Sequence, residues 1–561
     1  MPMGRGEIRL TIEIGWVDGM AANGVNLDAL IPRADLSVGE GVVAGETGPT
    51  QLTYTLFMEN DFFAKFLRKP EFQRETIHWS PKKIFDLVAD FLDRRLVPAV
   101  ILWRAGQFNF VVDGAHRISA LMAWIYDDYG DGDRSKALFG PRLPPEQEAL
   151  ARKTRTLIDR GIGKFKLYQA GLTHPSVVTD SQTARMSNLT ITFFVAQWVP
   201  ATSAKAAEDS FFTINDAATP LDKTEKRIIR SRESASAIAS RAIAHGGSGY
   251  AYWQKFPEGV QKIIVDTSKD IYAALYRPPM PEGTVDTLDV PVAGRGYSVL
   301  PFVFDLVNQV NATKAADSTG AKIKDRLEPD VEGVDTAKYL KRVWRTVSRL
   351  TSKEPTSLGL HPVVYFYTRG GAFSPWAFLA WSQIVDRIFA EGKANRFCDV
   401  RSEMERFLID HKWVMTEIIH KNGSGDRSTP WLDRYWSLAL QLLMDGKTYD
   451  EVIHTMNEHK DFGLLRFKDP MIRMAAADKK PGTGKFAPKT TTAAIWDAAL
   501  PGAPKCPYCH GLWHRNSFHG DHINPKRAGG DNRQSNEAIA HPYCDATYKD
   551  YRATRTAQGP S

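Results

Sequence analysis

The stretch CPYCHGLWHRNSFHGDHINPKRAGGDNRQSNEAIAHPYCDATYKDYR, residues 506–552, contains three of the four cysteines of this 561-residue chain. Cys506 and Cys509 form one pair with two residues between them, and His541 and Cys544 form a second pair. Each pair can sit on a tight turn that directs both side chains to one tetrahedral Zn²⁺ ion. Such a site is closed by its four protein ligands. We therefore expect a structural zinc, because a segment this short builds little core by itself.

The stretch between the two pairs contains, in order, Asp521-His522-Ile523-Asn524-Pro525, Gly529-Gly530 and Asn536. The whole segment resembles the HNH nuclease family, whose pattern runs CxxC, DHIxP, GG, N, a second metal pair followed by His or Asn, and then Lys. The resemblance covers about 45 residues. It implies a zinc-stapled ββα-metal fold that cleaves DNA. A zinc ribbon without catalysis is the alternative.

The resemblance also implies a role for each matching residue. His522 would be the general base that activates water, and Asp521 would bind a catalytic Mg²⁺ or Mn²⁺ ion. Asn536 would hold the loop and orient His522. Asp545 stands where the family has His or Asn, and its carboxylate would be a second ligand of the catalytic ion. The residues expected to contact the DNA backbone are Lys526, Arg527, Arg533 and Lys549.

Three further histidines and one further cysteine could also bind a metal and need an assignment. His510, His514 and His519 lie between the two zinc pairs. They are alternatives to His541 as zinc ligands, or they belong to a solvated loop that contacts phosphate. Cys398 stands alone in a helical stretch, and we expect it to be a small core residue.

Residues 80–126 predict a helix, two strands and a second helix. Ser80-Pro81 is typical of a helix start, and the helix would run until Pro98 stops it. Residues 99–103 and 108–112 predict two buried strands, and 115–126 predict another helix. Residues 127–160 are charged and predict loops, 189–199 predict a strand, and 222–465 are largely helical. The apolar face of the first helix is formed by Ile84, Leu87, Val88, Phe91 and Leu92.

A second set of motifs accompanies these elements. Gln73-Arg74 precedes Trp79, the sequence DGAHR occupies 113–117, and SFFTINDAATPLDKTE occupies 210–225. Together they resemble the ParB/sulfiredoxin-like domain of DGQQR type, found in GmrSD-like restriction enzymes and in proteins of phosphorothioate-DNA systems. The matching residues of the last stretch are Phe212, Asn215, Pro220, Leu221 and Glu225.

This resemblance implies a site that binds, and often hydrolyses, a nucleoside triphosphate. A DG turn before a helix leaves helix N-terminal amides free to bind an anion. The ligand could be NTP or a DNA backbone phosphate. Alternatively, Asp113 is only a helix cap and Arg117 only a surface charge. The expected phosphate-binding residues are Arg74, Asp113, Gly114, His116 and Arg117.

The fold class expected from these features is α+β and multidomain. We expect an N-terminal extension over 1–50, a ParB-like domain over 51–225 and a helical domain over 226–474. A linker rich in Ala, Lys, Thr, Pro and Gly would follow over 475–505, and the HNH module would be tethered separately over 506–561. Within the helical domain, the basic stretch 338–353 could face DNA, but its apolar stripe favours core packing.

Charge and hydropathy limit the partners. The net charge of +7 permits a polyanion such as DNA but does not require one. No apolar run reaches about 18 residues and the N-terminus lacks a signal-like apolar core, so we expect a cytoplasmic protein without membrane contact. The chain has no complete GxxxxGK[ST] motif; Gly482-Thr483-Gly484-Lys485 resembles half of one, within the expected linker.

These features predict a metal-dependent endonuclease of a restriction-like, anti-phage defence system that acts on foreign or modified DNA. The N-terminal domain would control cleavage, and a homo-oligomer would permit cleavage of both strands. The alternative is a nucleotide-regulated sensor in which the HNH module only binds DNA.

Overall fold

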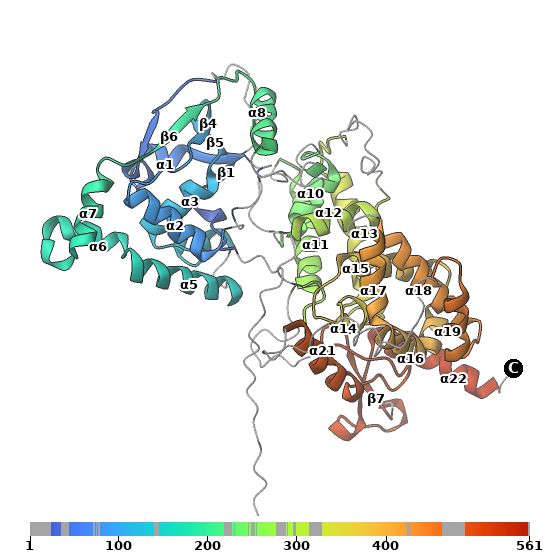
Figure 1. Cartoon of the computed structure of the whole chain (residues 1–561). Helices are drawn as coiled ribbons and strands as arrows, with labels where there is room; N and C mark the ends of the chain where they lie inside the picture. The colour runs from blue at the N-terminus through green and yellow to red at the C-terminus, as the bar shows by residue number, and fades with distance from the viewer. Residues whose placement is uncertain are drawn as a thin grey trace, which may run out of the picture.

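The computed structural model describes residues 24–34, 44–70, 73, 76, 79–139, 145–217, 227–228, 231–244, 246–247, 253, 255–276, 288, 290–294, 299–312, 328–422, 427–462, 488–524 and 526–558. Figure 1 shows an N-terminal part built on a sheet, a helical part, and a small C-terminal part that lies against the helical part. The chain is therefore of α+β class and rich in helices, as the sequence predicts.

The N-terminal part is organised around a six-stranded mixed sheet. Its strand order is β1-β3-β5-β4-β6-β2. The hairpin β4–β5 is antiparallel, whereas β3 pairs with β5 and β4 with β6 in parallel. The strands are β1 Arg33–Ala34, β2 Gln51–Thr53, β3 Leu67–Pro70, β4 Val100–Ala105, β5 Phe108–Asp113 and β6 Phe193–Trp198.

Helices pack against this sheet, and two of them confirm the sequence prediction closely. α2 begins at Pro81 behind the Ser80 cap, and α3 spans Ala115–Tyr126. α2 ends at Leu92, before Pro98, because Asp93 leaves the helical conformation and Arg94 takes a positive φ of 59°. The helices are α1 Phe62–Phe66, α2 Pro81–Leu92, α3 Ala115–Tyr126, α4 Asp133–Phe139, α5 Pro145–Gly161, α6 Phe165–Thr173, α7 Asp180–Leu189 and α8 Ala204–Ala217.

The prediction of loops over 127–160 is wrong. α4 and α5 occupy most of that range. α5 is mainly charged, but Ala151, Thr154 and Ile158 form a narrow buried stripe at helical spacing. The abundance of charged residues hid that stripe, which packs α5 against α2.

The helical prediction for the middle of the chain is confirmed. The predicted apolar stripe of α13, formed by Leu340, Val343, Val347 and Leu350, is fully buried. None of the helices described here is long and apolar enough to cross a membrane. The helices are α10 Ala235–Ala244, α11 Glu258–Tyr276, α12 Val299–Val310, α13 Val334–Leu350, α14 Pro362–Tyr365, α15 Pro375–Ala390, α16 Ala394–Asp410, α17 Lys412–Asn422, α18 Ser428–Met444 and α19 Tyr449–Glu458.

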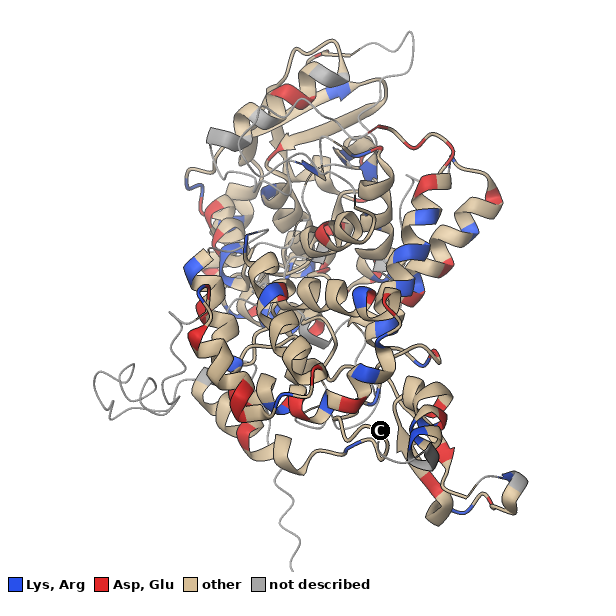
Figure 2. Cartoon of the chain, turned by 90° about the vertical axis from the view of Figure 1, so that its right-hand side faces the viewer, with Lys and Arg blue, Asp and Glu red and all other residues tan. Residues whose placement is uncertain are grey.

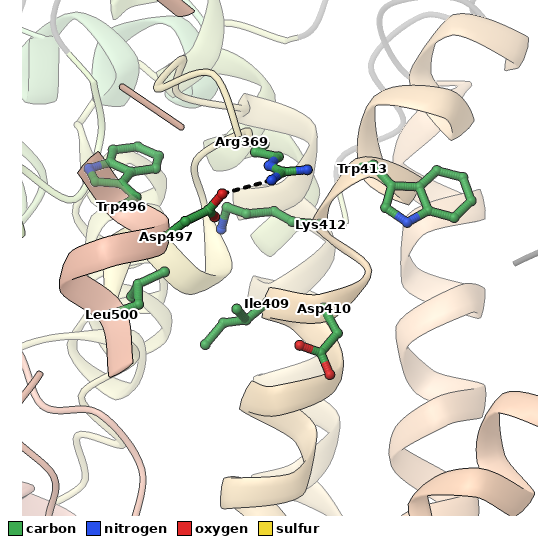
Figure 3. Close-up of a pocket in the computed structure, with 8 residues that line it drawn as sticks. All are labelled: Arg369, Ile409, Asp410, Lys412, Trp413, Trp496, Asp497 and Leu500. Atoms are coloured by element: carbon green, nitrogen blue, oxygen red, sulfur yellow. Dashed lines mark hydrogen bonds and ion pairs between the residues drawn. The ribbon is translucent and has the colours of Figure 1, made fainter. Parts of the chain in front are cut away.

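The second half of the expected linker is a packed helix. α21 spans Pro488–Ala499, and the buried side chains of Trp496 and Leu500 belong to the core of the helical part. Asp497 accepts a hydrogen bond from Arg369 at 2.7 Å (Figure 3). The threonine- and alanine-rich composition suggested a linker, but one apolar edge is enough to dock the helix. The first half, 475–487, and Gly482–Lys485 within it, lie outside the described residues.

The C-terminal part is not a separately tethered unit. It contains β7 His519–His522, β8 Glu537–Ala540, a π-helical turn Cys544–Tyr548 and α22 Lys549–Gln558. Its buried residues Leu512, Ala540, Tyr543 and Tyr548 belong to the same apolar cluster as the helical part. Both parts therefore share one core.

The pocket drawn in Figure 3, about 210 Å³ in volume, lies between α21 and the turn that joins α16 to α17. Lys412 lines it and is buried, and its Nζ donates to the carbonyl oxygens of Val363 and Val364. Burial lowers the pKa of Lys412 from 10.5 to about 7.

Lys412 gives a testable pH dependence. Between pH 7 and about 10.5 the unfolded chain binds a proton that the folded chain lacks, so the free energy of unfolding rises with pH in this window. The slope from this group is at most about 1.4 kcal/mol per pH unit. Lys412→Met should reduce the gain in thermal midpoint between pH 7.5 and pH 9, whereas Lys421→Met, at the exposed end of α17, should not. Equal pH dependence in the wild type and Lys412→Met would contradict this assignment.

Candidate metal centre and catalytic hairpin

The four expected zinc ligands meet at one point. The ligand atoms of Cys506, Cys509, His541 and Cys544 all lie within 4.8 Å of one another, and all four residues are buried. His541 Nδ1 lies 3.3 Å from Cys509 Sγ. Its Nε2 lies 3.0 Å from the Leu512 carbonyl oxygen, which fixes the proton on Nε2 and leaves Nδ1 for the metal. Burial lowers the pKa of His541, so the ring is neutral, as a ligand must be.

A buried ion pair from α16 supports this centre. Arg401 Nε donates to Glu405 Oε1 at 2.8 Å, and both side chains are almost fully excluded from water. The guanidinium also donates to the carbonyl oxygens of Leu358 and Gly359 in the helical part and of Leu512 in the C-terminal part. Glu405 Oε2 accepts from the Leu512 amide at 2.6 Å. The pair therefore joins the turn that carries Cys506 and Cys509 to the helical part.

Two glycines permit the close fit around this pair. A Cβ at Gly511 would lie 2.3 Å from Arg401 Nε. Gly359 has a φ of +60°, and a Cβ there would lie 2.7 Å from the His541 ring. The side chain of any larger residue at either position would therefore clash with Arg401 or His541.

The predicted catalytic residues lie on and around the β7–β8 hairpin. Lys549 Nζ donates to Asp521 Oδ1 at 2.9 Å and to Asp545 Oδ1 at 2.6 Å. Tyr508 donates to the other oxygen of Asp521. Desolvation alone would raise the pKa of Asp521, but hydrogen bonds from Tyr508 and Lys549 lower it overall. Both carboxylates are therefore held close to one cation, the ammonium group of Lys549.

Asn536 and His522 occupy the end of the same hairpin. The Asn536 amide donates to the carbonyl oxygens of Asn524 and Asp531 and accepts from the Asn524 amide, which closes the loop between them. The carbonyl oxygen of Asn536 accepts from the amide of Ile523, the neighbour of His522. His522 Nε2 lies 3.0 Å from Asn532 Oδ1. The loop thus determines the orientation of the His522 ring.

The residues expected at the DNA backbone are distributed differently. Lys526 and Arg533 are exposed, and Arg533 lies 3.2 Å from Asp531. Lys549 instead lies between the two carboxylates. The side chain of Arg527 and residue Pro525 lie outside the described part. Lysine and arginine alternate with acidic residues over the elements seen in Figure 2, so the net charge does not form a single patch in that view.

The three histidines left open by the sequence have different positions. None of them belongs to the candidate metal cluster, whose histidine is His541. His510 is exposed and takes a φ of 56° at the turn after Cys509. His514 is buried against His361. His519 lies beside Asp545, with Nδ1 3.1 Å from Oδ2.

The N-terminal motif residues meet where β5 leads into α3. Gly114 caps α3 with a φ of 96°, and a Cβ there would lie 2.6 Å from Val100. Arg117 Nη2 donates to Asp113 Oδ2 at 2.6 Å. His116 stacks on Trp79 with ring centroids 5.6 Å apart. Arg74, Pro220, Leu221 and Glu225 lie outside the described residues, as do the side chains of Phe212 and Asn215.

Two buried polar atoms at this junction lack hydrogen-bond partners within the described part of the chain. They are Gln73 Oε1 and Arg117 Nε. Gln73 reaches the same strand end as Asp113, because its Nε2 donates to the Val112 carbonyl oxygen at 3.4 Å. Unpartnered buried polar atoms are rare in native proteins and often mark a ligand position.

An ion cluster that the sequence did not reveal holds the segment before Trp79. Asp28 accepts from Arg33, from Lys69 at 2.6 Å and from the Thr76 amide at 3.0 Å. Burial alone would raise the pKa of Asp28, but the two cations hold it well below its usual range. Arg33 also donates to the Gln73 carbonyl oxygen, so the cluster positions Gln73.

Two family models match the chain. The model of the GmrSD restriction endonuclease N-terminal domain matches residues 56–231, and the HNH endonuclease model matches residues 506–550. The chain joins a GmrSD-type N-terminal domain to a C-terminal HNH endonuclease domain. Searches of curated proteins and of solved structures gave no match. The likeness of the GmrSD-type domain to ParB stays a prediction.

The HNH domain depends on residues that its motif does not include. Arg401 and Glu405 lie in a different domain, so no local pattern could assign them. Tyr508 and Asn532 lie inside the motif, but only their contacts with Asp521 and His522 assign them a function. Cys398, expected to be a core residue, is indeed buried.

The metal centre gives a direct test. We expect one zinc per chain by native mass spectrometry, and Cys544→Ser should lose it. Because the centre shares a core with the helical part, the variant should also lower the unfolding temperature of that part by several degrees. Cys398→Ser, which removes a cysteine outside the ligand set, should retain the zinc. Full zinc content in Cys544→Ser would contradict the ligand assignment.

Proposed function

We propose that this protein is a metal-dependent DNA endonuclease of a restriction-like system directed against foreign, including modified, DNA. The HNH domain would hydrolyse the phosphodiester bond, and the GmrSD-type domain would control when it does so. The observation that carries the proposal is the placement of Asp521, Asp545 and His522 around one short hairpin.

The donor set fits a hard divalent ion. The ammonium group of Lys549 already fills a cation position between Asp521 and Asp545. Carboxylate oxygens are the ligands that Mg²⁺ and Mn²⁺ prefer. An ion held by these two residues would stabilise negative charge on the phosphate and on the leaving oxygen.

His522 would take the proton from the attacking water. Asn532 Oδ1 can only accept a hydrogen bond, so its contact with Nε2 favours the tautomer that carries the proton there. Nδ1 is then free to act as the base. Asn536 would keep this orientation by closing the loop, as a positioning residue. Lys526, Arg527 and Arg533 would contact the DNA backbone.

The GmrSD-type domain would bind a phosphate group at the β5–α3 junction. The helix N-terminus at Gly114, together with His116 and Arg117, offers donors to an anion. Arg74 and Asp113 would complete the site. The bound group would be an NTP or a backbone phosphate of DNA.

A second candidate function is DNA binding without cleavage, regulated by nucleotide. The specific observation in its favour is that the ammonium group of Lys549 already pairs with both carboxylates, at the position that a metal ion would take. In this case the HNH domain would serve as a zinc-stabilised DNA-binding module.

His522→Ala distinguishes the two candidates. If His522 is the base, plasmid cleavage with Mg²⁺ or Mn²⁺ should fall by about 10²–10⁴-fold. His510→Ala, an exposed histidine of the same domain, should cleave like the wild type. Cleavage that survives His522→Ala would refute the assignment of the base. A wild type that binds DNA but never cleaves, with either metal and with NTP, would favour the binding module.

Arg117→Ala tests the control site. We expect the wild type to hydrolyse NTP and the variant to lose at least about 10-fold of that turnover, because the developing phosphate charge loses a donor. Arg95→Ala, which removes an exposed arginine after α2, is the control. Absence of turnover in the wild type would reject the NTPase role and leave a DNA backbone phosphate as the ligand. Comparing the cleavage of modified DNA with that of unmodified DNA then tests whether the site senses DNA.

A further inference from the structure

His519 lies two residues before Asp521 on β7, so both side chains project from the same face of the strand. Its Nε2 lies 2.8 Å from the carbonyl oxygen of Lys353, just after α13, and its Nδ1 lies 3.1 Å from Asp545 Oδ2. The ring is therefore held between the helical part and the Asp545 carboxylate.

These two contacts impose different requirements on the ring. A carbonyl oxygen can only accept, so Nε2 must carry a proton. In the neutral ring Nδ1 then presents a lone pair to a carboxylate oxygen, and the two repel each other unless a cation lies next to both. His541 has the same arrangement, with Nε2 on the Leu512 carbonyl oxygen and Nδ1 directed at the cysteine sulfurs of the zinc cluster.

The separation of the two atoms also suits a shared metal ion. Neighbouring ligands of an octahedral ion, with bonds of about 2.1 Å, lie about 3 Å apart. Nδ1 and Oδ2 are separated by 3.1 Å. The second oxygen of Asp545 is joined to Asp521 through Lys549, so the same carboxylate connects His519 to the other proposed ligand.

We propose that His519 is a third protein ligand of the catalytic divalent ion, beside Asp521 and Asp545, and that it gives the site a preference for Mn²⁺ over Mg²⁺. This inference rests on the proposed nuclease function. Imidazole nitrogen suits transition ions, whereas Mg²⁺ favours oxygen ligands. The Lys353 carbonyl would be the outer partner that orients the ring.

The competing assignment is a fixed ion pair, with a protonated His519 donating to Asp545. In that case His519 would position the carboxylate without touching the ion. The two assignments differ in one observable, which is direct bonding of a histidine nitrogen to the metal.

The experiment uses the full-length, zinc-loaded chain without DNA, so that metal binding is measured independently of cleavage. Mn²⁺ and Mg²⁺ affinities are determined by calorimetry, and pulsed electron paramagnetic resonance of bound Mn²⁺ detects nitrogen coupling. We expect the wild type to show that coupling and a tighter affinity for Mn²⁺. His519→Ala should lose the coupling and at least about 10-fold in Mn²⁺ affinity. His519→Gln, which keeps an oxygen donor in place of the nitrogen, should shift the preference toward Mg²⁺. His510→Ala should match the wild type.

The outcomes separate this inference from the function on which it rests. Mn²⁺ binding without nitrogen coupling, or coupling that persists in both His519 variants, would overturn the inference and leave the two-carboxylate site standing. A wild type that binds neither ion beyond its zinc would overturn the proposed metal-dependent function as well.

Discussion

The buried pair of Arg401 and Glu405 is the constraint on which the arrangement of the catalytic end depends. Removing an ion pair from water costs several kcal/mol per ion unless further hydrogen bonds satisfy it. Here main-chain groups and one hydroxyl provide them. Arg401 donates to the carbonyl oxygens of Leu358, Gly359 and Leu512. Glu405 accepts from the Leu512 amide and from the Tyr365 hydroxyl. The partners come from both sides of the interface. The pair is therefore satisfied only when the HNH domain is docked.

The same logic extends from the ion pair to the catalytic hairpin. Leu512 accepts a hydrogen bond from His541, which orients one member of the Cys/His cluster. This cluster brings together the two ends of the segment that carries β7 and β8. Ser517 adds a polar link, because its hydroxyl donates to the Ser352 carbonyl oxygen at 2.6 Å. The hairpin thus inherits its position from contacts that reach well into the helical part.

Sequence reasoning located what depends on local spacing. The cluster of Cys506, Cys509, His541 and Cys544 could be predicted, because the two residues between the members of each pair give a characteristic spacing. The α3 helix was predicted to the residue, since a DG turn and an apolar face define it. Charge and composition predicted a loop at α5 and a linker at α21. Both segments are helices, because a narrow apolar stripe docks each of them despite many polar residues. The surroundings of Arg401 and Asp28 could not be predicted, because the partners that complete them, Leu512 for Arg401 and Lys69 for Asp28, are distant in the chain.

The shared core has a consequence for how such proteins can be assembled from parts. A chain cut before Cys506 would leave Arg401 and Glu405 facing water, and the excised segment would lose the residues that pack behind its Cys/His cluster. The HNH segment alone would therefore lack part of its core in a different protein. Recombination that exchanges it would have to carry α14 and α16 along, so the heritable unit is larger than the catalytic motif.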